Sequence, residues 1–487
     1  MKMRNLVAAL LAATSLAACA AGPDYVAPAL PAAGDAPFAG STSPEVVTTS
    51  PDDHWWRLYD DPVLNGLVVD ALAANTDVRV AVARIERARA SLRGARSDAL
   101  PQTAISGSGT YGRAAESQVP PGTDREGRTV DGQLAVSYEL DLFGRVRRGI
   151  EASRADLGAA RENADAVRVT VVADTVRAYV DATSAAEQLA VAHRTVDLLD
   201  RSVRITSARF ERGLNERLDV IRLMQLRDQQ AAEIPSLQAT RDAALFRLAT
   251  LTGRTPQDLP AAVRERTTTP DVAQPIPVGD GRTLLARRPD VKAAERRLAA
   301  DTARIGVATA DLYPKITLGG SVGTTAVGAT DVFGAGPLRW LVGPLISWAF
   351  PNQEAIRARI GAARADVQAD LATFDGTVLR ALEETETALS AYRNALLRKE
   401  RLGSARDAAG RAAKVSIARQ GRGQIDALAV LDAQRTLAQS ESTYAQATRD
   451  VAFAQVDLFR ALGGTWRDKT PVATRSVTAG AGESPVG

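Results

Sequence analysis

Cysteine and histidine are almost missing from this chain of 487 residues, which contains one cysteine and two histidines. A single thiol allows no disulfide within the chain, so packing alone must hold the fold together. The two histidines, His54 and His193, are too few and too far apart for a metal centre or a catalytic triad. No nucleophile and base occur at a meaningful spacing, so we expect no enzymatic activity, no metal and no other cofactor.

Net charge is also small, and long apolar runs are scarce. Lys and Arg number 60 and Asp and Glu 57, which gives a formal charge of +3. A near-neutral chain with interleaved charges gives no argument for binding nucleic acid. After the first residues, no apolar run reaches the ~20 residues that a transmembrane helix needs. Hydrophobic residues still make up 45% of the chain, which is ordinary for a folded protein.

The chain begins with the features of a bacterial export signal. Lys2 and Arg4 precede an apolar run over residues 6–16, and small residues follow it. This run of 11 residues falls short of the ~20 that span a bilayer, so residues 1–18 are predicted to be a cleaved signal peptide.

The single cysteine, Cys19, ends the stretch "LAAC". This stretch resembles the lipobox of bacterial lipoproteins. The resemblance implies that Cys19 becomes the mature N-terminus and carries an N-acyl and an S-diacylglycerol lipid. Ala20 follows where an Asp would be the usual cue for retention at the inner membrane, which favours the outer membrane. The alternative is an ordinary signal peptide that happens to contain a cysteine.

An internal repeat covers most of the chain. The stretch from Asp77 realigns without gaps with the stretch from Asp290, an offset of 290 − 77 = 213 residues. Further on, "IEASRAD" from Ile150 matches "IGAARAD" from Ile360 at an offset of 210. We therefore expect two copies of one long unit, at 61–270 and 271–465. They lie between a lipidated N-terminal segment, 19–60, and a flexible C-terminal tail, 466–487.

Each copy has the same predicted order of elements. Helical stretches at about 62–99 and 284–312 end before Pro101 and Pro314. The apolar period then changes to two in "DGQLAVSYELDLF" (131–143) and "LRWLVGPLISWAF" (338–350). Each of these strands has an upstream partner, at about 103–112 and 315–325, across a polar loop rich in Gly or Pro. The sequence thus predicts one long hairpin in each copy and four strands in all.

A very long helix follows each hairpin, at roughly 145–210 and 353–419. At 1.5 Å per residue the first would be on the order of 100 Å long. Apolar residues at steps of four and three predict coiled-coil packing between long helices. Gly213 and Gly423 then mark tight turns into returning helices.

Four alternating strands predict an assembly of several chains. Alternating strands of this length suit a transmembrane β-barrel, because a bilayer satisfies no open sheet edge. Four strands cannot close a barrel, eight would fill it with their own side chains, and twelve would leave a pore. A homotrimer is therefore the smallest assembly that conducts. The alternative is a helical lipoprotein with two incidental hairpins.

The stretches "WWRLYDDPVLNGLVVDAL", "YELDLFGRVRRGIEASRADL", "LLARRPDVKAAERRL" and "VLDAQRTL" resemble the TolC-like outer-membrane efflux factors, in particular their OprM/NodT lipoprotein branch. The resemblance covers nearly the whole chain. It implies a mixed α and β membrane protein in which long coiled-coil helices form an α-barrel below a trimeric, twelve-stranded β-barrel. It also implies a passive exit duct for small molecules in the outer membrane, driven by an inner-membrane transporter through a periplasmic adaptor. A coiled-coil lipoprotein that bridges the envelope is the competing hypothesis.

The resemblance also implies two kinds of site. In the family, a ring of Leu and Asp closes the periplasmic end of the duct, and the matching residues are Leu428 and Asp432. Arg222, which aligns with Asp432 in the first copy, is a candidate to pair with it in the closed state. The alternative is that Leu428 and Asp432 are ordinary surface residues of a coiled coil.

The second kind of site is the contact with the adaptor. Family members meet the adaptor at turns that match Arg212, Gly213 and Leu214 in the first copy, and Arg422 and Gly423 in the second. Gln424 departs from the usual Gly-Leu pattern. The alternative is that the two glycines only end their helices.

Overall fold

The computed structural model describes residues 20–29, 38–42, 44–122, 124–272, 274–327 and 338–463. These residues are mostly helical, with one larger sheet and one two-stranded sheet. None of the described helices combines the length and the apolar content needed to cross a membrane. The predicted signal peptide, Cys19 and the tail 466–487 lie outside the described residues.

The chain forms two compact units. The first, which we call the sheet unit, comprises Met1–Pro31, Ala81–Asn163 and Asp290–Arg380. The second, the helical unit, comprises Ala32–Val80, Ala164–Pro289 and Ala381–Gly487. Each unit contains parts of both sequence copies, because the long helices of each copy run from one unit into the other.

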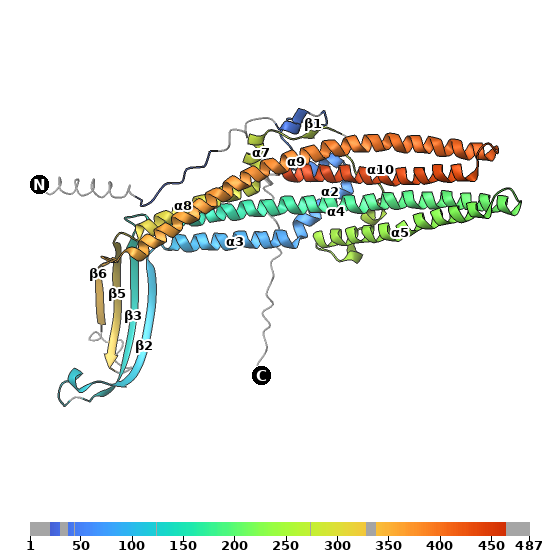
Figure 1. Cartoon of the computed structure of the whole chain (residues 1–487). Helices are drawn as coiled ribbons and strands as arrows, with labels where there is room; N and C mark the ends of the chain where they lie inside the picture. Colours follow the sequence, from blue (N-terminus) through green and yellow to red (C-terminus); the bar gives the residue numbers. More distant parts are fainter. Residues whose placement is uncertain are drawn as a thin grey trace, which may run out of the picture. The chain divides into compact units, whose positions relative to one another are not determined.

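The sheet unit contains the four predicted strands. They are β2 (Gln102–Arg113), β3 (Glu126–Leu140), β5 (Lys315–Val327) and β6 (Leu338–Ser347). All neighbours are antiparallel in the order β2-β3-β5-β6, so β3 and β5 join the two hairpins (Figure 1). Within the described sheet, β2 and β6 each keep one unpaired edge. The prediction of two hairpins is confirmed.

One face of this sheet carries an apolar row that crosses all four strands. Ile105 pairs with Leu134, Leu134 with Val322, and Val322 with Trp340. These side chains are 86%, 40%, 45% and 74% exposed, respectively. The opposite face carries Asp131, whose Oδ2 accepts hydrogen bonds from Thr325 Oγ1 and Arg339 Nη2. Leu341 and Leu345 of β6 depart from this alternation.

Two helices predicted as continuous are broken, so those predictions are wrong in this detail. The first divides into α2 (Pro62–Ala74) and α3 (Thr76–Ser97) at Asn75. The Asn75 side chain accepts hydrogen bonds from the backbone N–H groups of Asp77 and Val78, which starts a new helix. The second divides into α7 (Gly281–Arg287) and α8 (Pro289–Ala310) because proline disfavours helix at the residue before it.

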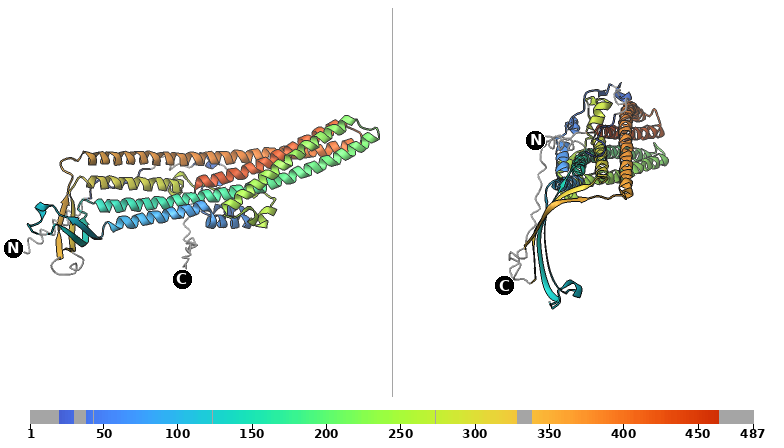
Figure 2. Two further views of the ribbon diagram at one scale, coloured as in Figure 1. Left: turned by 90° about the horizontal axis from the view of Figure 1, so that it is seen from below. Right: turned by 90° about the vertical axis from the view of Figure 1, so that its left-hand side faces the viewer.

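The long helices appear as predicted. They are α4 (Arg145–Glu211) and α9 (Glu354–Gly421), which return through α5 (Arg217–Leu251) and α10 (Ala427–Leu462). Both antiparallel pairs turn at the same end of the helical unit, as Figure 1 and the left view of Figure 2 show.

The helical unit has a core to which residues of the predicted N-terminal segment, 19–60, contribute. Trp55 in η3 (Trp55–Tyr59) stacks on Phe459 of α10 with ring centroids 4.6 Å apart. Phe38 and Val46 are also buried. Strand β1 (Val46–Val47) pairs in parallel with β4 (Ile276–Pro277). Part of the N-terminal segment predicted at 19–60 is therefore packed, because Phe38, Val46 and Trp55 belong to the core. The remaining short helices are η2 (Ala39–Thr42), η4 (Glu116–Gln118), η5 (Pro256–Asp258) and α6 (Ala261–Glu265).

Candidate functional site

The two helix turns have matching backbone geometry. Gly213 and Gly423 have φ angles of 72° and 71°. The N–H of Leu214 donates to Arg209 O at 2.9 Å, and the N–H of Gln424 donates to Arg419 O at 3.0 Å. These φ values favour glycine, because a side chain in this conformation is strained. The predicted turns are therefore present at both glycines.

Both turns are also open to solvent. A Cβ built on Gly213 or Gly423 would meet no atom within 4 Å. Leu214 beside the first turn is 67% exposed, and Arg212 and Arg422 are exposed as well. An exposed leucine beside an arginine leaves apolar and charged groups available to a partner. Departure of Gln424 from the usual leucine makes the second turn more polar than the first.

Leu428 and Asp432 lie one helical turn apart near the start of α10. The Asp426 side chain begins this helix by accepting a hydrogen bond from the backbone N–H of Ala429 at 2.9 Å. Leu428 is 49% exposed, and Asp432 is exposed beside it. Both line a hollow of about 190 Å³ between α5 and α10, together with Arg222, Leu226 and Arg435.

The hollow brings Arg222 and Asp432 together but does not pair them directly. Asp432 Oδ1 accepts a hydrogen bond from Arg435 Nη2 at 3.0 Å. In the described part of the chain, Arg222 forms no ion pair with Asp432. Sequence reasoning missed Arg435, although its i, i+3 spacing from Asp432 was a usable signal, because residues three apart on a helix are neighbours.

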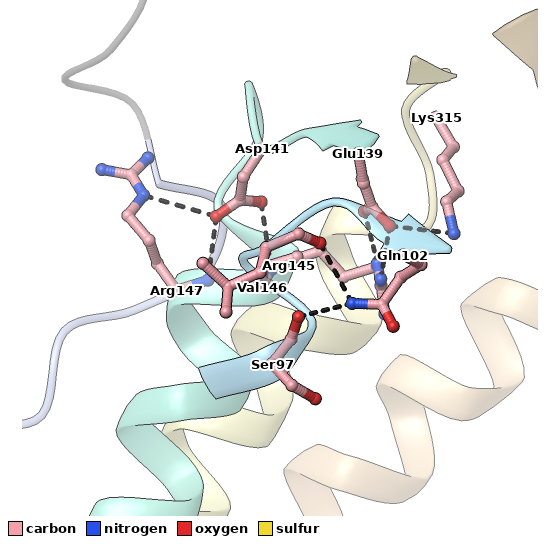
Figure 3. A network of polar contacts seen from close by, with 9 residues as sticks. Ser97, Gln102, Glu139, Asp141, Arg145, Val146, Arg147 and Lys315 are labelled. Atoms are coloured by element: carbon pink, nitrogen blue, oxygen red, sulfur yellow. Dashed lines mark hydrogen bonds and ion pairs between the residues drawn. The ribbon is translucent and has the colours of Figure 1, made fainter. Parts of the chain in front are cut away.

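Polar contacts at the end of the sheet connect strands to helices (Figure 3). Glu139 of β3 binds Arg145 of α4 through two hydrogen bonds of 2.8 and 2.6 Å, and Lys315 of β5 lies 2.9 Å away. Asp141 accepts hydrogen bonds from the backbone N–H groups of Val146 and Arg147, which satisfies two free donors at the start of α4. The sheet is thus joined rigidly to the first long helix.

The segment directly after Cys19 packs on the same unit. The N–H of Ala21 donates to Phe143 O at 2.9 Å, just beyond the end of β3. Arg148 Nη2 donates to Asp24 Oδ1 at 2.6 Å. Tyr25 Oη donates to Glu295 at 3.3 Å, and burial together with this carboxylate raises the pKa of Tyr25 to about 12. The residues next to Cys19 therefore lie at the end of the sheet.

The described residues contain no group of three or more His, Cys, Asp or Glu side chains that could hold a metal ion. His54 lies beside Trp56, with ring centroids 5.2 Å apart, and His193 is exposed on α4.

Comparison with known proteins gives matches over nearly the whole chain. Nodulation protein T of Rhizobium leguminosarum bv. trifolii is 30% identical over 460 residues, which cover 94% of this chain and 96% of that protein. Outer membrane protein OprJ of Pseudomonas aeruginosa is 31% identical over 463 residues, with the same coverage of 94% and 96%.

Solved structures agree with these relatives. The structure of the outer-membrane channel OprN has a TM-score of 0.86 and 35% identity, and the match covers 92% of this chain and all of that one. The open state of the Neisseria gonorrhoeae MtrE outer membrane channel has a TM-score of 0.80 and 28% identity, covering 92% and 98%. The family model for outer membrane efflux proteins matches residues 67–254 and, a second time, residues 281–464. This chain therefore belongs to the outer membrane efflux protein family.

Proposed function

We propose that this outer-membrane efflux channel protein works as a homotrimer and is a passive exit duct for small molecules. In this assembly an inner-membrane transporter drives export and a periplasmic adaptor connects the two. The observation that carries the proposal is the apolar row Ile105, Leu134, Val322 and Trp340, which crosses a sheet with two unpaired edges. A bilayer favours such a face only when the sheet is closed, and three copies supply the twelve strands of a barrel with a pore.

The double match of the family model supports an origin from two copies of one unit. The repeated order of helix, hairpin and long helical pair supports the same origin.

Exposed helix faces next to both sheet edges support the trimer. The face on α9, which follows β6, has small residues at steps of 4, 3, 4 and 3: Ala358, Ala362, Ala365, Ala369 and Ala372. The face on α3, which precedes β2, has the same steps: Ala83, Arg87, Ala90, Gly94 and Ser97. All ten residues are exposed. These are coiled-coil spacings without a partner helix. When β6 of one chain pairs with β2 of the next chain in the trimer, the α9 face of the first chain and the α3 face of the second come together.

The gate and the adaptor contacts are further parts of the proposal. Three copies would bring three Leu428 side chains and three Asp432 carboxylates to the axis, where they narrow the duct and favour cations over anions. Arg222 would stand beside this ring in the closed state. The exposed turns at Arg212, Gly213 and Leu214, and at Arg422 and Gly423, would receive the adaptor. Lipid on Cys19 would anchor the chain in the outer membrane beside its barrel.

A bridging lipoprotein remains the competing function, and it would need no sheet with an apolar face. Single-channel recording separates the two functions. Purified full-length protein is reconstituted in planar bilayers, and its mass in detergent is measured by light scattering. We expect discrete conductance steps from a particle with the mass of three chains. A trimer that never conducts, even after Asp432→Ala, would contradict the duct and favour the bridge.

A further inference from the structure

We call the hollow lined by Arg222, Leu428, Asp432 and Arg435 the gate hollow. A second hollow on α10 lies farther from the turn at Gly423 than the gate hollow does. Its volume is about 270 Å³, and it is lined by residues of α4, α5 and α10. Seven of the lining residues have polar side chains: Gln188, Thr195, Gln230, Glu233, Gln439, Ser442 and Gln446. The remaining lining residues, Val191, Ala192, Leu237, Ala438 and Ala445, are small or aliphatic.

Glu233 is the only ionisable group in this lining. The lining contains no Lys, Arg or His, so the hollow has a formal charge of −1 that nothing in it balances. This distinguishes it from the gate hollow, where Arg222 and Arg435 accompany Asp432. Because the local field is negative, the hollow attracts cations and repels anions.

Most of these polar side chains have hydrogen-bonding groups to spare. Among the described residues, the side chains of Gln188, Gln230, Gln446 and Glu233 make no hydrogen bond to protein atoms. Gln439 donates to Thr443 Oγ1 at 3.3 Å, and its amide oxygen stays free. Several residues with amide oxygens and one with a carboxylate therefore line the hollow without a protein donor.

The hollow opens on the same face of α10 as the gate residues. Asp432, Gln439 and Gln446 follow one another at intervals of seven residues, and all three are exposed. Residues seven apart lie on one side of a helix. If Asp432 faces the lumen of the duct, Gln439 and Gln446 face it too, and the hollow lies on the path of a solute.

We propose that this hollow is a binding site for cationic amines on the exit path, with Glu233 as its charged ligand and Gln188, Gln230, Gln439 and Gln446 as hydrogen-bond acceptors. An ammonium group has three donors and no acceptor, which matches a carboxylate surrounded by amide oxygens. Ca²⁺ takes six to eight oxygen ligands, often several of them carboxylates, and this lining supplies a single carboxylate. The inference rests on the proposed duct and names a class of solute for it.

Spermidine is a suitable probe, because it is a small, flexible molecule with several ammonium groups. It is titrated against the current through reconstituted full-length protein, and the concentration that halves the current is determined. We expect Glu233→Gln to raise this concentration about fivefold, the effect of losing a partly exposed charge pair. Gln446→Leu should raise it less. The matched control is Glu265→Gln, which removes an exposed glutamate from α6 and should change nothing.

A second measurement does not depend on an open duct. Spermidine should raise the thermal unfolding midpoint of the wild type in detergent, because a ligand that binds the folded state stabilises it. The rise should be lost in Glu233→Gln and kept in Glu265→Gln, and benzoate, an anion, should produce none.

An equal response of Glu233→Gln and the wild type in both measurements overturns the binding site. So does a block that disappears only in Asp432→Asn, since the gate would then be the sole cation site. Absence of any current in both the wild type and Asp432→Ala counts against the duct, whereas the thermal measurement still decides the binding site.

Discussion

The backbones of Gly22 and Gly306 lie in direct contact, and a Cβ built on Gly22 would lie 2.5 Å from Gly306 Cα. A Cβ on Gly306 would lie 2.7 Å from Arg148 Cγ and 2.8 Å from Ala21 O. There is no room for a side chain between the N-terminal segment and α8 at this point. The two glycines therefore allow the residues that follow Cys19 to pack against α8, and we call this close approach the Gly22–Gly306 contact.

Replacing Gly306 with alanine should therefore release the N-terminal segment from α8. We expect faster proteolytic trimming of residues 20–29 and a lower thermal midpoint, because the contact between Asp24 and Arg148 depends on the Gly22–Gly306 contact. The control is Gly149→Ala in α4, where a Cβ meets nothing within 4 Å. That change should stabilise the protein by about 0.5–1 kcal/mol, since alanine favours helix over glycine. Equal protease resistance in both variants would show that the Gly22–Gly306 contact does not hold the N-terminal segment in place.

The Gly22–Gly306 contact shows why part of this structure could not be predicted from the sequence. The four strands and the turns at Gly213 and Gly423 follow from local signals, namely a period of two and a glycine between apolar periodic runs. A contact between residues 284 positions apart, as 306 − 22, leaves no such local signal. The break at Asn75 was missed for a related reason. An asparagine within an apolar periodic run looks like a surface residue until its side chain is seen to cap the next helix.

The same distinction applies to the residues proposed to form the gate. Alignment of the two copies suggested Arg222 as the partner of Asp432, whereas the local i, i+3 neighbour Arg435 forms the hydrogen bond. A side chain one helical turn away on its own helix can reach Asp432 without any tertiary contact. The pairing with Arg222 in the closed state stays a prediction.

Arg288 should be among the most sensitive arginines of the helical unit. Its guanidinium donates to the carbonyl of Ala461 at 3.0 Å and to Glu384 at 2.7 Å, and the residue is only 8% exposed. Arg288→Met keeps the apolar stem but leaves the buried carbonyl of Ala461 with only the long 3.5 Å hydrogen bond from Thr385 Oγ1, so we expect a loss of about 1–3 kcal/mol of stability. Thermal unfolding in detergent measures it. Arg89→Met, which breaks an exposed pair with Glu86, should cost no more than about 0.5 kcal/mol. Equal thermal midpoints of Arg288→Met and Arg89→Met would show that the hydrogen bonds of Arg288 do not stabilise the helical unit.

Asp280 should make the stability of α7 depend on pH in the acid range. The backbone N–H of Thr283 donates to Asp280 Oδ1 at 2.7 Å, and this hydrogen bond, with the Thr283 hydroxyl, holds the pKa of Asp280 below its ordinary value of 3.8. A carboxyl with a lowered folded-state pKa stabilises the fold fully above its unfolded pKa. This stabilisation disappears as pH falls through the folded value.

Asp280→Ala should therefore cost about 1 kcal/mol at pH 7, the usual value of a helix cap, and progressively less below pH ~4. Asp280→Asn keeps an acceptor and should recover most of the stability at pH 7. Thermal midpoints of the three proteins between pH 2 and 7 provide the measurement. Asp242→Ala, an exposed site on α5, is the control and should run parallel to the wild type. A constant difference between Asp280→Ala and the wild type over this range would refute the role of the charge.

The exposed small residues of α9 should be essential for trimer formation. Ala365 lies at the centre of the face defined by Ala358, Ala362, Ala365, Ala369 and Ala372, and helices can approach closely only across small side chains. Ala365→Trp should prevent assembly while each chain stays helical, because the site is exposed in the single chain. Native mass measurement and circular dichroism follow the two properties. The neighbouring exposed residue supplies the control, Arg364→Trp, which points away from this face and should assemble normally. Intact trimers of Ala365→Trp would place the interface elsewhere.

The pair Asp432 and Arg435 predicts opposite changes in ion selectivity. Arg435 lies 3.0 Å from Asp432 and partly neutralises the proposed ring of carboxylates. Removing the arginine should expose the carboxylates and make the duct more selective for cations, whereas Asp432→Ala should make it less selective and raise the closed-state leak. Each change should be about twofold in the permeability ratio, consistent with the ~0.3–0.5 kcal/mol of an exposed helix pair. The reversal potential in a KCl gradient gives the ratio, with Arg411→Ala on α9 as an exposed control. If Arg222→Ala raised the leak and Arg435→Ala had no effect on selectivity, the closed ring would depend on the contact between repeats and not on the local pair.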